Sequence, residues 1–125
     1  MGEDLDLLLV KAKEAVSNCY CPYSGFHVTA VIEDCEGGLH SGVNVENSSY
    51  GLTICAERAA VFSALSSGKK KFKRILIYSP DGDPVPCGAC RQVLAEFCED
   101  DFPVILATPC SIKHYILAEL LPHRF

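Results

Sequence analysis

The chain has 125 residues, of which 49% are hydrophobic, and its formal net charge is −5 at neutral pH. This is the length of one ordinary domain, and the apolar content is enough to build a core without covalent cross-links. The negative charge argues against a polyanionic partner such as a nucleic acid, and no apolar run is long enough to span a bilayer. We expect a single domain over residues 1–125. The mean hydropathy of +0.18 indicates some apolar surface buried between subunits.

Eight cysteines, at positions 19, 21, 35, 55, 87, 90, 98 and 110, raise the question of disulfides. Disulfide frameworks occur mainly in small secreted chains that lack an adequate core. This chain has enough apolar residues for a core, and the segment MGEDLDLLLV carries acidic residues where a secretion signal would be positively charged. We therefore expect reduced cysteines, some of them binding a metal, in a soluble cytoplasmic protein.

The N-terminal part of the chain predicts a helix followed by a β-hairpin. Leu8, Ala12 and Ala15 share one face at helical spacing, which indicates a helix over residues 4–17. Apolar and polar residues alternate loosely over 27–34 and 39–47, on either side of the turn sequence CEGG. This pattern is typical of two antiparallel strands.

The rest of the chain alternates helical patterns with short apolar runs. The apolar spacing of TICAERAAVFSALSSG is helical, and Thr53 is available as its N-cap. The runs RILIYSP and FPVILATP are nearly continuous, as expected of buried strands. In chain order, we expect a helix over 53–68, a strand over 74–80, a helix over 86–100, a strand over 102–109 and a closing helix over 115–122.

The order of these elements indicates the fold class. A strand, a helix and another strand over 74–79, 87–98 and 103–108 suggest a right-handed crossover between parallel strands. The hairpin adds an antiparallel pair to the same sheet. The sequence therefore predicts an α/β fold, a three-layer α/β/α sandwich with a mixed sheet.

The segment PCGACRQVL contains a C-x-x-C pair, Cys87 and Cys90. This spacing alone suits a redox couple, half of a structural zinc site, part of a catalytic metal centre or two inert thiols. Cys55 and the C-x-x-C pair each lie at the start of a predicted helix. If those helix N-termini face each other, three thiolates converge and leave a fourth position open, as a catalytic zinc site requires. No second C-x-x-C supplies a fourth ligand, so we expect the other five cysteines to be mostly buried and inert.

The segment CAER places Glu57 two residues after Cys55. A carboxylate there can take a proton from a zinc-bound water and deliver it to a substrate; alternatively, it only complements the positive helix N-terminus. C-A-E at 55–57 combined with P-C-x-x-C at 86–90 forms the zinc deaminase signature in its all-cysteine variant. Because three thiolates leave the site negatively charged, we expect Arg58 to donate hydrogen bonds to a thiolate rather than to form only a surface ion pair.

With these motifs, the sequence resembles the small, homotetrameric type of zinc-dependent cytidine deaminase. The similarity runs in the family's order over nearly the whole chain, through CPYSGF (21–26), GVNVENSSYG (42–51), TICAERAA (53–60), PCGACRQ (86–92) and ELLPHRF (119–125). The resemblance implies a cytidine deaminase-like fold and a homotetramer whose active sites are shared between subunits. It also implies one Zn²⁺ per subunit, bound by Cys55, Cys87 and Cys90.

The resemblance further implies a set of substrate-binding residues. Asn44 and Glu46 would bind the ribose 3'-hydroxyl, although ENSS is also rich in turn formers. Phe26 would pack on the pyrimidine ring, although an ordinary core position would also explain it. The backbone N–H of Ala56 would bind the pyrimidine carbonyl.

Two aromatic residues are expected to act across subunits in the same way. Tyr50 lies in a segment that contributes to a neighbouring subunit, and Phe125 matches a C-terminal aromatic that enters a neighbouring active site. One departure from the family pattern is FHVTA, which has His27 and Thr29 where the family usually has Pro-x-Gly after the aromatic. These two residues would lie beside the pocket and alter base or sugar preference.

The expected reaction is hydrolytic deamination of cytidine and 2'-deoxycytidine to the uridine products and ammonia, a step of pyrimidine salvage. Glu57 would carry the proton from a zinc-activated water to ring N3 and then protonate the leaving amine, while hydroxide attacks C4. Neither a nucleic acid nor a membrane is expected as a partner, because the basic run Lys69 to Arg74 is typical of a solvated helix end.

Three other functions remain open from the sequence. A related enzyme would act on an aminonucleoside antibiotic such as blasticidin S. A nucleic-acid editor would need a basic groove for a single strand. A non-enzymatic zinc module would leave Glu57 unexplained.

Overall fold

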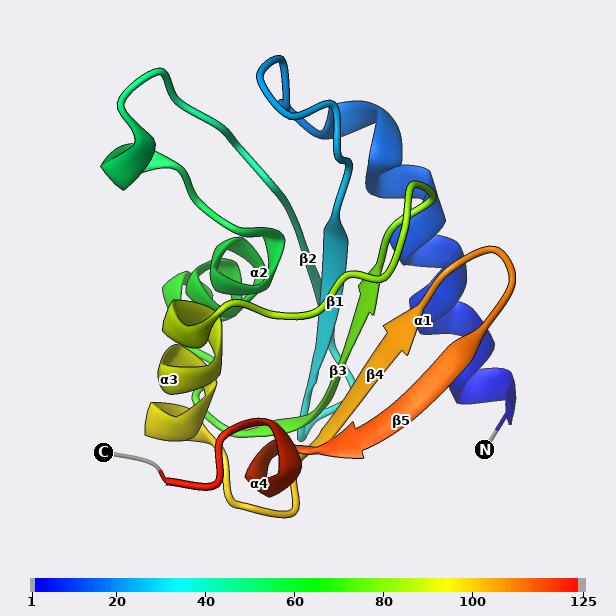
Figure 1. Cartoon of the computed structure of the whole chain (residues 1–125). Coiled ribbons are helices and arrows are strands. Elements are labelled where there is room, and N and C mark those ends of the chain that lie inside the picture. Colours follow the sequence, from blue (N-terminus) through cyan, green and yellow to red (C-terminus); the bar gives the residue numbers. More distant parts are fainter. Residues whose placement is uncertain (1, 124–125) are drawn as a thin grey trace.

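The computed structural model describes residues 2–123, and its centre is one five-stranded sheet in the order β2-β1-β3-β4-β5 (Figure 1). The strands are β1 (Thr29–Asp34), β2 (Leu39–Val43), β3 (Phe72–Tyr78), β4 (Pro103–Ala107) and β5 (Ile112–Ile116). The pairing of β3 with β4 is parallel, and the other pairings are antiparallel. The predicted hairpin and the predicted crossover between parallel strands are both confirmed.

Helices cover both faces of this sheet. Helix α1 (Gly2–Ala15) lies on one face, and the other face carries α2 (Ala56–Ser66), α3 (Gly88–Phe97) and the short α4 (Leu117–Leu120) (Figure 1). Two 3₁₀ turns, η1 (Val16–Asn18) and η2 (Tyr50–Leu52), complete the elements. The prediction of a three-layer α/β/α sandwich with a mixed sheet is confirmed. Within residues 2–123, no helix combines the length and the apolar character needed to cross a membrane.

The central strands are buried on both sides, and their alternation divides the core into two clusters. Val31 and Leu76 pack under α1 together with Leu8 of that helix. Ile32 and Ile77 point the other way and pack in the cluster that contains residues of α2, α3 and α4. Because successive strand residues face opposite sides of a sheet, one continuous apolar run fills both clusters.

The predicted helix over 115–122 is wrong in its first part. Residues Ile112–Ile116 form β5, which pairs antiparallel with β4 at the edge of the sheet, and α4 begins only at Leu117. The Glu119 carboxylate accepts a hydrogen bond from the Ile116 N–H (2.9 Å) and so holds the start of this short helix. The apolar spacing of YILAELLP suits a helix, but the ladder with β4 decides the conformation of its first residues.

The predicted N-cap of α2 is also wrong. The helix begins at Ala56 with Cys55 as its N-cap residue. Thr53 Oγ1 instead accepts a hydrogen bond from the Asn47 N–H (3.1 Å), inside the segment between β2 and α2. At the other end, Gly68 has a φ of 87°, and the Lys69 N–H donates to the Ala64 carbonyl (3.0 Å), which closes the helix as expected of a glycine stop.

The basic run over 69–74 leads into β3 rather than extending the end of a helix. Lys69 Nζ lies 2.7 Å from Glu36 Oε1, and Arg74 Nε lies 2.8 Å from Glu33 Oε1. Two of its charges are thus paired with carboxylates of the β1–β2 hairpin.

Helix α2 lies directly against β2 at Gly42. A Cβ atom at Gly42 would be 2.3 Å from the backbone nitrogen of Ala60 and 2.5 Å from the carbonyl oxygen of Ala56. Both contacts are with backbone atoms, which have no rotamer through which to move away. The missing side chain therefore sets the distance of the first turn of α2 from the sheet.

Candidate metal centre and active site

Three cysteine sulfurs converge at the N-termini of α2 and α3. Cys55 and Cys87 are the N-cap residues of these helices, and Cys90 lies in the first turn of α3. Their Sγ atoms are all within 4.8 Å of one another, with 3.7 Å between Cys55 and Cys87 and 3.4 Å between Cys87 and Cys90. Sulfurs bound tetrahedrally to one zinc ion at 2.3 Å would be about 3.8 Å apart. The arrangement fits three thiolate ligands, and the side chains described over residues 5–123 contain no other group of three metal-ligating residues so close together.

The protonation of these thiols also suits a cation. The pKa of Cys55 is lowered to about 5, first because of its hydrogen bond with Cys90 and also because of Arg58. The pKa of Cys90 is raised, first by the same hydrogen bond, because Cys90 keeps the shared proton. Since zinc binds thiolates, a zinc ion between these sulfurs would replace that proton.

Arg58 provides positive charge beside the sulfurs. Its Nη2 donates to Cys55 Sγ over 3.5 Å, and this contact is the first cause of the raised pKa of Arg58. The Nε of Arg58 is buried and has no hydrogen-bond partner among the described residues. The guanidinium charge partly offsets the negative charge that three thiolates would bring to the site.

Glu57 lies in the same helical turn as Cys55 and is 4% exposed. Burial, followed by the charge of Cys55 among the raising causes, raises the pKa of the Glu57 carboxyl to about 7. A carboxyl with a pKa near neutrality can both accept and return a proton, which is the property that general acid–base catalysis requires.

A cavity of about 330 Å³ opens beside this centre. Its wall includes Cys55, Ala56, Glu57 and Cys87, whereas Cys90 lies fully buried behind it. The same cavity is also lined by three predicted residues of the nucleoside site, Phe26, Asn44 and Glu46. Residues from two motifs that are distant in sequence therefore face one space.

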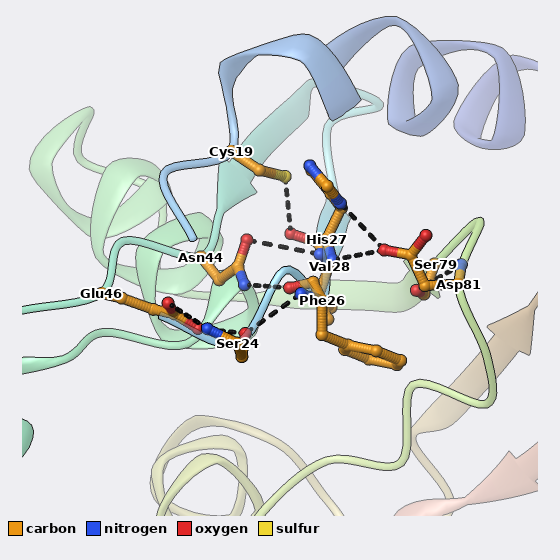
Figure 2. A network of polar contacts seen from close by, with 9 residues as sticks. All are labelled: Cys19, Ser24, Phe26, His27, Val28, Asn44, Glu46, Ser79 and Asp81. Atoms are coloured by element: carbon orange, nitrogen blue, oxygen red, sulfur yellow. Dashed lines mark hydrogen bonds and ion pairs between the residues drawn. The ribbon is translucent and has the colours of Figure 1, made fainter. Parts of the chain in front are cut away.

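Asn44 and Glu46 also hold the segment that carries Phe26 (Figure 2). Asn44 Nδ2 donates to the Phe26 carbonyl (2.7 Å), and Asn44 Oδ1 accepts from the Val28 N–H (3.3 Å). Glu46 accepts hydrogen bonds from the Ser24 hydroxyl and from the Ser24 N–H (3.1 Å). These contacts, the hydroxyl first, lower the pKa of Glu46. Both side chains line the cavity while fixing its opposite wall.

The two aromatics expected to act across subunits are placed differently. Tyr50 is 83% exposed and does not line the cavity beside the cysteines. It lines a neighbouring cavity of about 420 Å³, which shares Ser24 and Glu46 with the first. Phe125 lies outside the described residues.

Two sequence interpretations of smaller features need correction. Thr29 does not face the pocket, because its hydroxyl is fully buried and donates to the Ala12 carbonyl of α1 (2.9 Å). Cys35 and Cys110 are exposed rather than buried, although Cys21 and Cys98 are buried as expected. No cysteine pair is joined as a disulfide among the described residues.

One part of the cavity wall is not predicted from the sequence. Asp83, Pro84 and Val85 line the cavity from the connection between β3 and α3. Their position immediately before the P-C-x-x-C motif was the available signal, since residues that lead into a ligand-bearing helix N-terminus must pass close to the metal.

Known proteins share these features. Residues 3–106 match the family described as the cytidine and deoxycytidylate deaminase zinc-binding region. The chain is 43% identical over 124 residues to the cytidine deaminase of Sporosarcina psychrophila, which covers 98% of this chain and 91% of the relative. The crystal structure of cytidine deaminase from Burkholderia pseudomallei is similar with a TM-score of 0.90 and 40% identity, over 96% of this chain and 98% of the other. The blasticidin-S deaminase of Bacillus cereus is 33% identical over 132 residues, 98% of this chain and 92% of the relative.

Proposed function

Because the chain belongs to the cytidine and deoxycytidylate deaminase family, we propose that it hydrolyses cytidine and 2'-deoxycytidine to uridine and 2'-deoxyuridine with release of ammonia, in pyrimidine salvage. One observation carries this proposal. Cys55, Cys87 and the buried Glu57 line the same cavity as Asn44 and Glu46, and the third sulfur, of Cys90, lies within 4.8 Å of the other two. A purely structural zinc module would need neither the carboxyl nor the cavity.

The chain's own residues supply binding and proton transfer. A zinc ion held by Cys55, Cys87 and Cys90 would act as a Lewis acid that lowers the pKa of water and so makes it nucleophilic near neutral pH. Glu57 accepts a proton from the attacking water and gives it to ring N3, which makes C4 electrophilic. Glu57 then takes the second proton of that water, now on the C4 hydroxyl, and gives it to the leaving amine, so that a C4–O bond replaces the C4–N bond and ammonia departs.

The cavity offers a partner for each part of a nucleoside. Asn44 and Glu46 combine an amide with a carboxylate, which suits a ribose 3'-hydroxyl that both donates and accepts. The Phe26 ring supplies a flat apolar surface for the pyrimidine. The Ala56 N–H at the start of α2 is available to the pyrimidine carbonyl because the first N–H groups of a helix have no intrahelical acceptor.

We also propose a homotetramer in which Tyr50 and Phe125 reach a neighbouring active site. Tyr50 and Tyr23 are 83% and 57% exposed and line the neighbouring cavity, where a second subunit would cover them. Residues 1–125 would form one domain per subunit with one zinc ion. A reducing cytoplasm would suit a site built from three thiolates.

A spectrophotometric assay of the zinc-loaded protein tests the proposed substrate. Cytidine, 2'-deoxycytidine and blasticidin S are compared at equal concentrations, with zinc content measured on the same sample. We expect rapid loss of the cytidine and deoxycytidine absorbance and at most slow change with blasticidin S. A reversed preference would overturn the substrate assignment, because the blasticidin-S deaminase of Bacillus cereus is also a relative.

A further inference from the structure

His27 and Asp81 form a contact that joins two segments distant in sequence. The His27 backbone N–H donates to Asp81 Oδ2 (2.7 Å), and His27 Nδ1 lies 2.8 Å from the same oxygen. The two residues are 54 positions apart in the chain. One carboxylate oxygen thus receives two contacts from a single residue (Figure 2).

Each partner adjoins a different wall of the cavity. His27 follows Phe26, and Asp81 precedes the segment 82–85, of which residues 83–85 line the same cavity. The two walls also touch directly, since a Cβ atom at Gly82 would be 3.2 Å from Cε1 of the Phe26 ring. The position of the ring therefore depends on the position of the 82–85 segment.

Asp81 is itself held by the sheet. Its N–H donates to Ser79 Oγ (3.1 Å), and the fully buried Ser79 donates its own N–H to the Ala107 carbonyl at the end of β4 (3.2 Å). The backbone N–H of His27, and then its side chain, lower the pKa of Asp81, so the acceptor is a carboxylate at neutral pH. Asp81 is thus held in place by the sheet, and its carboxylate can position the segment that carries Phe26.

On its other side, the same segment is tied to the predicted ribose-binding residues. The Phe26 carbonyl accepts from Asn44, and the Phe26 N–H donates to Ser24 Oγ (3.0 Å). Figure 2 shows the ring projecting from a segment that Ser24 and Glu46 hold on one side and Asp81 holds on the other. Without the Asp81 contact, the segment would be held from one side only.

We propose that His27 is a positioning residue, which acts through Asp81 to fix the Phe26 ring and the 82–85 segment as one wall against the pyrimidine. This inference rests on the proposed function. His27 does not line the cavity. Its loss should therefore weaken nucleoside binding while leaving Glu57 and the metal ligands in place.

The test measures kcat and KM for cytidine in His27→Ala, Asp81→Ala and the double variant, each with zinc content and thermal midpoint. We expect KM to rise about fivefold in His27→Ala and about tenfold in Asp81→Ala, with kcat within threefold of the unsubstituted protein. The double variant should be no worse than Asp81→Ala, because Asp81→Ala already removes both contacts with His27, including the side-chain contact that His27→Ala removes. His27→Asn, whose amide nitrogen occupies nearly the place of Nδ1, should restore KM to within about twofold.

A matched control and a second variant make the result decisive. Glu36→Ala breaks an exposed contact of the same length, 2.7 Å to Lys69, far from the cavity, and should leave KM unchanged. If His27→Ala loses zinc or unfolds, His27→Phe keeps a ring without its nitrogen and should show the same rise in KM. An unchanged KM in the folded His27 variants, independent effects in the double variant, or no rescue by asparagine would each overturn the inference. Absence of turnover in the unsubstituted protein would instead overturn the proposed function, and this inference with it.

Discussion

Glu57 follows Cys55 by two residues, so a buried carboxyl and a metal-binding sulfur share the first turn of α2. In the proposed enzyme, Cys55 would hold the metal at the helix N-terminus, and the same turn places the Glu57 carboxyl at the cavity wall. Metal binding and proton transfer would therefore depend on residues of the same helical turn. A substitution of one residue can remove one of these functions and keep the other.

Glu57→Gln should separate them. The amide keeps the shape of the side chain but cannot carry a proton, so we expect kcat for cytidine to fall by about 10² to 10⁴. Zinc per chain, measured by atomic absorption, should stay at the level of the unsubstituted protein. Glu96→Gln, an exposed glutamate of α3, serves as the control and should retain activity. Turnover close to normal in Glu57→Gln would remove the carboxyl from the mechanism.

Cys87→Ser should remove metal and stability together. The sulfurs of Cys55 and Cys90, within 4.8 Å of each other, remain as ligands. Because a site with one ligand fewer binds zinc far more weakly, we expect zinc content to fall at least about tenfold. Each kcal/mol lost lowers the thermal midpoint by about 4 °C in a chain of this size. Cys35→Ser, which changes an exposed cysteine in the β1–β2 turn, should alter neither quantity. Full zinc content in Cys87→Ser would exclude it as a ligand.

Gly42→Ala tests whether β2 positions the active-site helix. The added methyl would lie 2.3 Å and 2.5 Å from backbone atoms of α2, so the first turn of that helix must move. We expect a lower thermal midpoint and reduced zinc content, because Cys55 moves with the helix. Gly51→Ala adds the same methyl where no atom lies within 4 Å and should preserve both. An unchanged thermal midpoint in Gly42→Ala would show that α2 can adjust without cost.

Asp34 should govern part of the stability in acid. His40 Nε2, 2.8 Å away, is the first cause that lowers the pKa of Asp34 to about 2, and the Gly38 and Glu36 N–H groups add to it. Because the folded pKa is below the ordinary 3.8, the stabilisation is complete above about pH 4 and is lost as the pH falls toward 2.

Urea unfolding of the unsubstituted protein and Asp34→Asn at several pH values measures this effect. The difference in unfolding free energy should be largest at neutral pH and should shrink between pH 4 and the most acidic condition. Asp6→Asn, on an exposed part of α1, controls for the loss of one charge. A difference that stays constant with pH would contradict the assignment.

Glu46→Ala should weaken nucleoside binding in two ways. It removes a side chain that lines the cavity, and it removes the carboxylate that accepts the hydrogen bond from the Ser24 N–H. We expect KM for cytidine to rise about tenfold to a hundredfold. Ser24→Ala removes one donor to Glu46 and the acceptor of the Phe26 N–H but keeps the Glu46 carboxylate at the cavity wall, and it should raise KM by less. With 3'-deoxycytidine, the difference between Glu46→Ala and the unsubstituted protein should narrow. An equal difference with both nucleosides would argue against a contact between Glu46 and the 3'-hydroxyl.

The zinc centre is predictable from sequence because its residues come in short motifs at helix starts. Cys87 and Cys90 are close in the chain, and both lie at the N-terminus of α3, so their sulfurs are near each other. The remaining assumption is that the N-terminus of α2, with Cys55, lies beside them. The two-sided burial of the second half of β3 is likewise visible in a continuous apolar run. Local pattern and tertiary structure agree at these positions.

The features that sequence reasoning missed depend on partners that are distant in the chain. Strand β5 forms because the edge of β4 accepts it, although its end has helical spacing. Thr53 contacts Asn47 instead of capping a helix, because the helix starts later. The pairing of His27 with Asp81 spans 54 positions and has no periodic signal. Contacts of this kind follow from the completed fold.

Asn44 has one further consequence. Its side-chain amide donates to the Phe26 carbonyl and accepts from the Val28 N–H. The same side chain lines the cavity where the sugar would lie. In the proposed enzyme, recognition of the sugar and of the base would therefore depend on the same side chain. Analogues altered at both the ribose and the pyrimidine should lose affinity non-additively, and selection for a new sugar would also change tolerance for the base.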